Sequence, residues 1–124
     1  AGRVHARVVR PITKVFTLYI RIFIMIHGRR LSSERDRFHL GRKKGQSNLR
    51  KHGIAFETAC EVFFDPFVRL IETEVVSGEV RESLLGMTSE WRLLRVVYVF
   101  RSATIRLISA RPVTLGERKQ YEDQ

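Results

Sequence analysis

Three arginines in predicted strands carry the side chain that is best suited to hold a phosphate group. Arg81, Arg106 and Arg111 each lie in a segment of alternating or continuous apolar residues, which predicts β-structure. A guanidinium is planar and can donate two parallel hydrogen bonds to a phosphate, so it can also stabilise charge that grows on phosphoryl oxygens. For Arg81 and Arg106 the alternative is a structural role, in which the side chain points outward and pairs with solvent or a glutamate.

Lys51 and His52 form a second basic group, at the end of a predicted helix. Gly53 follows them, and a residue without Cβ can take the left-handed conformation that closes a last helical turn. The two cations would then lie beside unpaired carbonyl groups, where positive charge is favoured. We favour this structural role for His52, and a role as a general base stays open.

Cys60 is the only cysteine and lies on the apolar stripe of the next predicted helix. Phe56, Ala59, Cys60 and Phe63 form that stripe at helical spacing. We therefore expect Cys60 to be a small core residue and not a nucleophile. The chain can form no internal disulfide and has no Cys–His cluster of metal-ligand spacing, so a reducing compartment such as the cytoplasm is the natural expectation.

The positive charge is concentrated in the first part of the chain. The formal net charge is +10; residues 1–50 contain 13 Lys or Arg and two acidic residues, whereas residues 51–124 contain 10 and 11. Such a basic arm predicts a polyanionic partner, either nucleic acid or an anionic membrane surface. A solvated or disordered basic tail explains the charge equally well.

Residues 1–37 are predicted to be a basic and apolar extension that precedes a domain at residues 38–124. The apolar run at 15–26 follows several basic residues, as in a signal peptide, but Arg21 interrupts it and no small-residue cleavage site follows. The run is also too short to span a bilayer, and its β-branched content would suit a strand. We expect a disordered or misassigned extension, with a polar linker at residues 28–47.

The remainder is predicted to be an α+β domain. Two helices end near Asp65-Pro66, and Thr114 and Glu117 have the spacing of a capping box, which predicts a short helix through Tyr121. Between them, short turn-like breaks separate four apolar segments that are predicted to be strands. These lie at residues 67–75, 80–86, 92–100 and 104–111. They would form an antiparallel meander with the helices on one face.

The order of these residues resembles one protein family, the BrnT-type toxins of bacterial type II toxin–antitoxin modules. The resemblance covers residues 38–122 and depends on an ordered set, not on a single motif. The set comprises Lys44, Asn48, Lys51-His52-Gly53-Ile54, Phe56-Glu57, Val62-Phe63, Asp65-Pro66, Gly78-Glu79, Arg81, Gly86, Leu93-Leu94, Val96-Val97-Tyr98, Ile105-Arg106, Ile108-Ser109-Ala110-Arg111, Glu117 and Tyr121. Phe38-His39-Leu40-Gly41 stands where the family usually has a strand reading Phe-x-Trp-Asp, and Phe100 stands at a commonly acidic position.

The resemblance implies a small ribonuclease of RelE-like fold, with two N-terminal helices, about four antiparallel strands and a short C-terminal helix. It implies a metal-independent endoribonuclease without a cofactor, which cleaves RNA and arrests translation and growth. It also implies a cognate ribbon-helix-helix antitoxin (BrnA-like) that neutralises the toxin. Operator DNA would be bound only through that antitoxin, and no membrane is expected.

Carried over to this chain, the resemblance assigns catalytic roles to Arg81, Arg111 and His52, and RNA-binding roles to Lys51, Arg106 and Tyr121. Tyr121 has an equal alternative, which is to pack the last helix against the body. A non-catalytic alternative stays open for the whole chain. It would be either a degenerate toxin that still holds its antitoxin, or a basic nucleic-acid-binding module.

The meander also predicts how the arginines lie along the sheet. Arg81 and Arg106 are expected at similar height, with Arg111 nearer the opposite end, so one shared pocket does not follow from the sequence. Arg95 occupies a position that is usually apolar in the family. We expect it to matter little for RNA cleavage.

Overall fold

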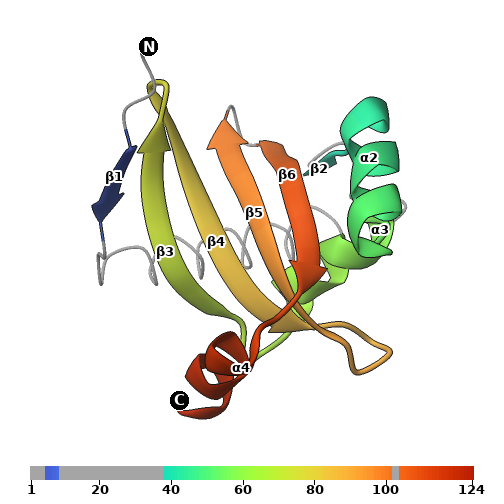
Figure 1. Cartoon of the computed structure of the whole chain (residues 1–124), viewed down its shortest axis with the longest axis vertical. Coiled ribbons are helices and arrows are strands. Elements are labelled where there is room, and N and C mark those ends of the chain that lie inside the picture. Colours follow the sequence, from blue (N-terminus) through green and yellow to red (C-terminus); the bar gives the residue numbers. More distant parts are fainter. Residues whose placement is uncertain (1–4, 9–37, 102–103) are drawn as a thin grey trace.

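The computed structural model describes residues 38–101 and 104–124, together with the backbone of residues 5–8. These residues form an α+β domain in which a twisted sheet carries a helical layer on one face (Figure 1). The predicted class is confirmed, as is the order of two helices, a meander and a last helix. The predictions for the apolar run at 15–26 and for residues 28–37 lie outside the described residues.

Within the described residues, six strands form one sheet in the order β1-β3-β4-β5-β6-β2. The strands are β1 (His5–Val8), β2 (Phe38–His39), β3 (Arg69–Val76), β4 (Glu79–Met87), β5 (Leu93–Arg101) and β6 (Thr104–Pro112). The predicted meander corresponds to β3–β6, in which each strand is antiparallel to the next. Two edge strands flank the meander: β1, which was not predicted, pairs antiparallel with β3, and β2, which lies where the resembled family usually has a strand, pairs parallel with β6. Both are too short to show a periodic pattern.

Two β-bulges decide which side chains share a face of the sheet. Because side chains alternate between the faces, one extra residue exchanges the two faces for the rest of its strand. Leu70 and Leu107, which precede the bulges, belong to the core or pack against it. Simple alternation from these leucines would direct Glu72 and Arg111 toward the core. Because of the bulges, they lie on the face of the sheet away from the core. The extra residues are Ile71 in β3 and Ile108 in β6.

The helical layer consists of α2 (Arg42–His52), the one-turn α3 (Phe56–Ala59) and the 3-10 helix η1 (Cys60–Phe64). The predicted end of α2 is confirmed, because Gly53 has φ +70° and its N–H donates to the carbonyl of Leu49. The predicted polar linker to residue 47 is wrong at its C-terminal end, since α2 already begins at Arg42.

Asn48 gives the physical reason for the longer helix. Its side-chain amide donates to the carbonyls of Ile54 and Ala110 at 2.9 and 2.8 Å, and accepts from the N–H of Ala110 at 3.0 Å. These buried bonds fix α2 to β6. Polar composition alone therefore indicated a linker where tertiary contacts stabilise a helix.

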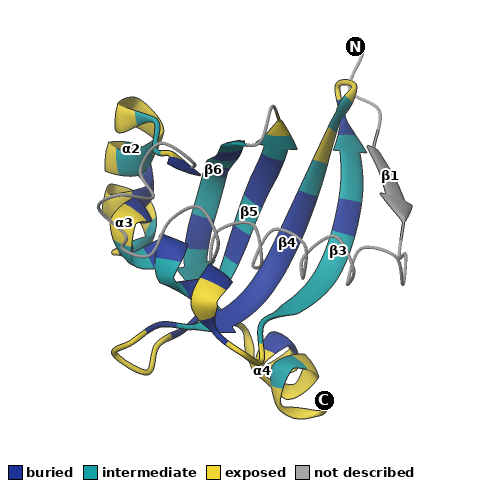
Figure 2. Ribbon diagram, turned by 180° about the vertical axis from the view of Figure 1, so that it is seen from behind, coloured by how far each residue is buried: buried dark blue, intermediate teal, exposed yellow. Residues whose placement is uncertain are grey.

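The core lies between the helical layer and the sheet (Figure 2). Phe63 of η1 packs edge-on against Phe38 of β2 and Tyr98 of β5, with ring centroids 5.3 and 5.1 Å apart. Gly86 permits the close approach of η1 to β4, because a Cβ there would lie 2.7 Å from the Cβ of Val62. Cys60 is buried in this core, as predicted.

The last helix, α4 (Leu115–Glu122), begins with the predicted capping box of Thr114 and Glu117. Its far end is fixed by Asp65, whose carboxylate accepts the hydroxyl of Tyr121 at 2.7 Å. The same carboxylate accepts the N–H groups of Phe67 and Met87 at 2.9 and 2.7 Å. Asp65 thus joins α4, the start of β3 and the end of β4. In the described part of the chain, no helix has the length and apolar character to cross a membrane.

Candidate functional site

Arginines project along the whole face of the sheet that lies opposite the helical layer, and we call this surface the arginine face. It carries Arg69 of β3, Arg81 of β4, Arg95 and Arg101 of β5, and Arg106 and Arg111 of β6. The predicted heights are confirmed. On β5, Val99 pairs with Arg106 of β6, and the adjacent Tyr98 pairs with Glu82 of β4, the residue after Arg81. Arg81 and Arg106 therefore lie at similar height. Arg111 pairs with Arg95, near the other end of β5.

At the α4 end of the arginine face, two arginines and two glutamates form an ion-pair network. Glu117 accepts two hydrogen bonds from the guanidinium of Arg111, at 2.9 and 2.8 Å, and one from Arg95 at 2.7 Å. Arg95 also donates to Glu72 at 2.6 Å and to the hydroxyl of Ser83 at 3.2 Å. The charges of the two arginines are therefore matched by two carboxylates.

Glu117 lies at the centre of this network. Burial by itself would raise the pKa of its carboxyl group, but hydrogen bonds from Arg111, the backbone of Thr114 and Arg95 outweigh it and lower the pKa to about 2. Glu117 is thus ionised at neutral pH and a weak base. The network suits structural attachment of α4 to the sheet better than proton transfer.

Arg95, which was expected to matter little for RNA cleavage, has a structural role. It bridges β5 to β3, β4 and α4 through three side chains. No sequence pattern indicates this role, because the bulge at Ile71 is what places Glu72 on the same face.

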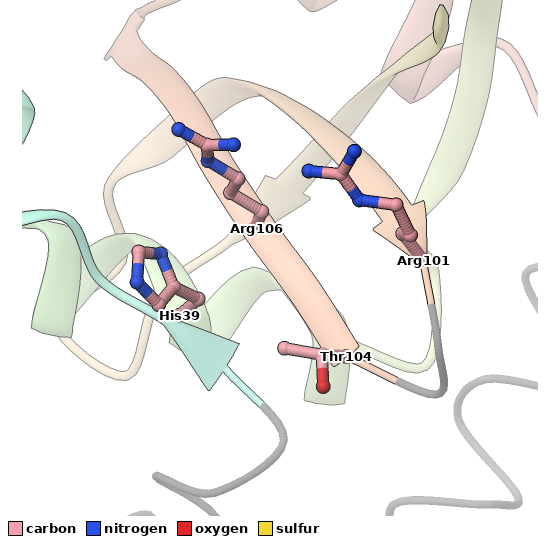
Figure 3. Close-up of a pocket in the computed structure, with 4 residues that line it drawn as sticks. All are labelled: His39, Arg101, Thr104 and Arg106. Atoms are coloured by element: carbon pink, nitrogen blue, oxygen red, sulfur yellow. The ribbon is translucent and has the colours of Figure 1, made fainter.

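At the opposite end of the arginine face lies a second group, which we call the cationic pocket. His39 of β2, Arg101 of β5, and Thr104 and Arg106 of β6 line it (Figure 3). The side chains of His39, Arg101 and Arg106 stand on the same side of their strands. The volume of the pocket is about 210 Å³, and among the described residues no carboxylate lines it.

The cationic pocket has little compensation for its charge. Among the described residues, the side chains of His39 and Arg106 have no hydrogen-bond or ion-pair partner. Arg101 lies 3.3 Å from the carboxylate of Glu79, but 60% of the Arg101 side chain is exposed, so solvent screens this pair.

Arg81 lies at the height of the pocket on β4, which β5 separates from Arg106 on β6. Its side chain is half-buried, and within the described part of the chain its buried Nε has no hydrogen-bond partner. Glu74 is its cross-strand neighbour on β3. A buried donor without a partner is uncommon in folded proteins and can mark a position that receives a ligand.

The other predicted site residues lie elsewhere. Lys51 and His52 end α2 in the helical layer, beside the last carbonyls of that helix. The hydroxyl of Tyr121 donates to Asp65, and burial together with this bond raises the pKa of the phenol. Tyr121 therefore has the packing arrangement that was its alternative to phosphate binding. The structure brings Arg81 and Arg106 near each other and does not bring all six predicted residues into one site.

A comparison with protein-family models decides the relationship of the chain. The model described as "Ribonuclease toxin, BrnT, of type II toxin-antitoxin system" matches residues 41–117. The chain belongs to the BrnT family. A search of curated proteins finds no match. Membership confirms the predicted resemblance and identifies a ribonuclease toxin of a type II system, which implies an RNA target and an antitoxin partner.

The BrnT match contains both ends of the arginine face but not the pocket residue His39. All the arginines of the face and Glu117 fall within it, whereas His39 and Tyr121 lie outside. Within the described ranges, no cluster of three or more His, Cys, Asp or Glu side chains could hold a metal ion.

Sequence analysis missed His39 and Arg101 as site residues. His39 lies in a strand of two residues, and it reaches Arg106 only because β2 pairs parallel with β6, far along the chain. Arg101 is the last residue of β5, next to a predicted turn. The two arginines on either side of the predicted turn, Arg101 and Arg106, were the available signal, but using it required the strand order.

Proposed function

We propose that this BrnT-family chain is a metal-independent endoribonuclease whose RNA binds at the pocket end of the arginine face. The family supports a ribonuclease toxin. The observation that carries the location is that Arg81 and Arg106 lie at one height on one face without carboxylates bonded to them among the described residues. Cations that are not neutralised by the protein are available to a polyanion.

The proposed reaction needs a positioned 2′-hydroxyl, a cation for the charge that grows on the phosphoryl oxygens, and proton transfers. We assign the stabilisation of charge to Arg81, whose planar guanidinium can donate two bonds to a phosphate. Arg111 was the second arginine assigned to this task. Its bonds to Glu117 support a structural role ahead of a catalytic one.

The experiment is induction of the chain alone in a bacterium, followed by growth measurement and RNA electrophoresis. We expect growth arrest, loss of translation and fragmented RNA. Purified protein should cleave a defined RNA equally well with and without EDTA. Activity that disappears with EDTA and returns with a divalent metal would contradict metal independence, and intact RNA with normal growth would contradict the ribonuclease proposal.

We further propose a ribbon-helix-helix antitoxin as the partner, with operator DNA bound only through it. The support is family membership, which implies an antitoxin without specifying its type. Co-expression with the product of the adjacent reading frame should restore growth and yield a co-purifying complex. The toxin domain is proposed to span residues 38–124.

A non-catalytic toxin-like protein that still holds its antitoxin is the second candidate. One observation favours it: Arg111 and Tyr121 are both engaged in internal bonds. Antitoxin binding without growth arrest or RNA cleavage would select this candidate.

A further inference from the structure

The charge of the cationic pocket is unfavourable in the isolated protein. The two guanidinium groups of Arg101 and Arg106 line the pocket from neighbouring strands, beside His39 and Thr104, and no acidic side chain of the described residues lines it. Like charges in proximity repel, and a bound anion would relieve this repulsion. The other end of the same face contrasts with this, since Arg95 and Arg111 are bonded to carboxylates there and Arg69 donates to the backbone carbonyl of Gln120.

The size of the pocket limits the anion. At about 210 Å³ it is smaller than the roughly 300–1,000 Å³ of pockets that enclose drug-sized ligands, and it is open to solvent. It therefore suits one small group on a larger molecule. A phosphate group fits this description, and arginine forks match phosphate oxygens with paired hydrogen bonds.

Backbone pairing fixes the positions of these side chains. His39 is the register partner of Arg106 in the parallel β2–β6 pair, and Arg101 is the partner of Thr104 in the β5–β6 hairpin. Side chains on paired strands need little rearrangement when a ligand arrives. Such preorganisation is expected of a binding site and not of a mobile basic tail.

We propose that the cationic pocket binds one phosphodiester phosphate of single-stranded RNA. Arg106 contributes the guanidinium fork, and Arg101 and His39 contribute further donors. The assignment of RNA as the carrier of the phosphate rests on the proposed function. Arg81 lies two strands from Arg106, about 10 Å away, so a bound RNA strand extends from the pocket toward it.

The test uses the full chain and a fluorescein-labelled single-stranded RNA whose riboses are all 2′-O-methylated, so that it cannot be cleaved. Fluorescence anisotropy at several salt concentrations gives the Kd and its salt dependence. Arg106→Gln should bind roughly tenfold more weakly, with a log–log salt slope smaller by about 0.7, the value of one lost phosphate contact. Arg101→Gln and His39→Gln should each weaken binding by a smaller factor.

Arg118→Gln is the matched control, because it removes the same charge from an exposed position on α4. It should change the Kd less than twofold. Arg106→Lys keeps the charge but loses the fork, so it should bind more weakly than wild type and more tightly than Arg106→Gln. Circular dichroism establishes whether each variant is folded. If Arg106→Gln does not fold, the Kd of Arg101→Gln supplies the test.

The outcomes separate this proposal from the proposed function. Pocket variants that bind like wild type, while wild type cleaves unmodified RNA, would overturn the pocket and leave the ribonuclease intact. Pocket-dependent binding by a protein that cleaves no RNA would support the pocket and contradict the ribonuclease. A wild type that does not bind the RNA at all would overturn the pocket.

Discussion

The two ends of the arginine face place the same side chain in different surroundings. At the α4 end, Arg95 and Arg111 are bonded to Glu72 and Glu117, and the positive and negative charges match. At the pocket end, the guanidinium of Arg106 has no bonded partner among the described residues. The difference lies in the neighbouring carboxylates and not in the arginines. Charge that the protein neutralises itself holds elements together, and charge that it leaves uncompensated is available to a ligand.

The largest effect is expected from Arg81→Lys in the cleavage reaction. Loss of the fork, with the charge kept, should lower the rate by about two to three decades, the effect of losing one preorganised donor. The measurement is single-turnover cleavage of a defined RNA by purified protein. Arg118→Lys is the control, because Arg95 belongs to the ion-pair network and is unsuitable. Equal rates for both variants would remove Arg81 from the mechanism.

The next effect is a loss of stability in Glu117→Gln. This change keeps the shape of the side chain but leaves the partly buried Arg95 and Arg111 without their shared carboxylate. We expect the free energy of unfolding in urea to fall by about 2–3 kcal/mol. Glu122→Gln, on the exposed surface of the same helix, should change it by about 0.5 kcal/mol or less. Similar small losses in both would show that the network does not hold α4.

Stability should also depend on pH through Glu117. Its pKa is about 2 in the folded protein against 4.5 ordinarily, so it stabilises the fold above pH 4.5 and this contribution is lost as the pH falls toward 2. The loss is about 3 kcal/mol at most. Buried Glu82 acts in the opposite sense, because burial raises its pKa and its protonation in acid favours the fold. Urea unfolding between pH 2 and 6 should therefore show a shallower acid loss for Glu117→Gln than for wild type. Parallel curves would contradict this.

The sequence predicted the elements of the arginine face more reliably than its contacts. Alternation and turn residues indicated β3–β6, and the spacing of Thr114 and Glu117 indicated the start of α4. The network was not predictable, because the bulges at Ile71 and Ile108 bring Glu72 and Arg111 to one face.

The pocket was not predictable for a different reason. β2 has two residues and pairs with a strand more than 60 residues later in the chain, so no local pattern indicates that His39 lies beside Arg106. The similar heights of Arg81 and Arg106 were predicted, because these heights follow from strand order alone. Local chemistry and periodicity indicate the elements, whereas register and edge pairing determine which charges meet.

The contrast between the two ends is tested most directly by the free energy of unfolding of Arg111→Gln and Arg106→Gln, measured in urea at neutral pH. Arg111→Gln breaks charge-assisted bonds to Glu117 and should lose about 1–2 kcal/mol. Arg106→Gln removes an uncompensated cation, so its free energy of unfolding should equal that of wild type or exceed it. A loss in Arg106→Gln as large as that in Arg111→Gln would mean that both ends of the face hold the fold together, and would contradict the account.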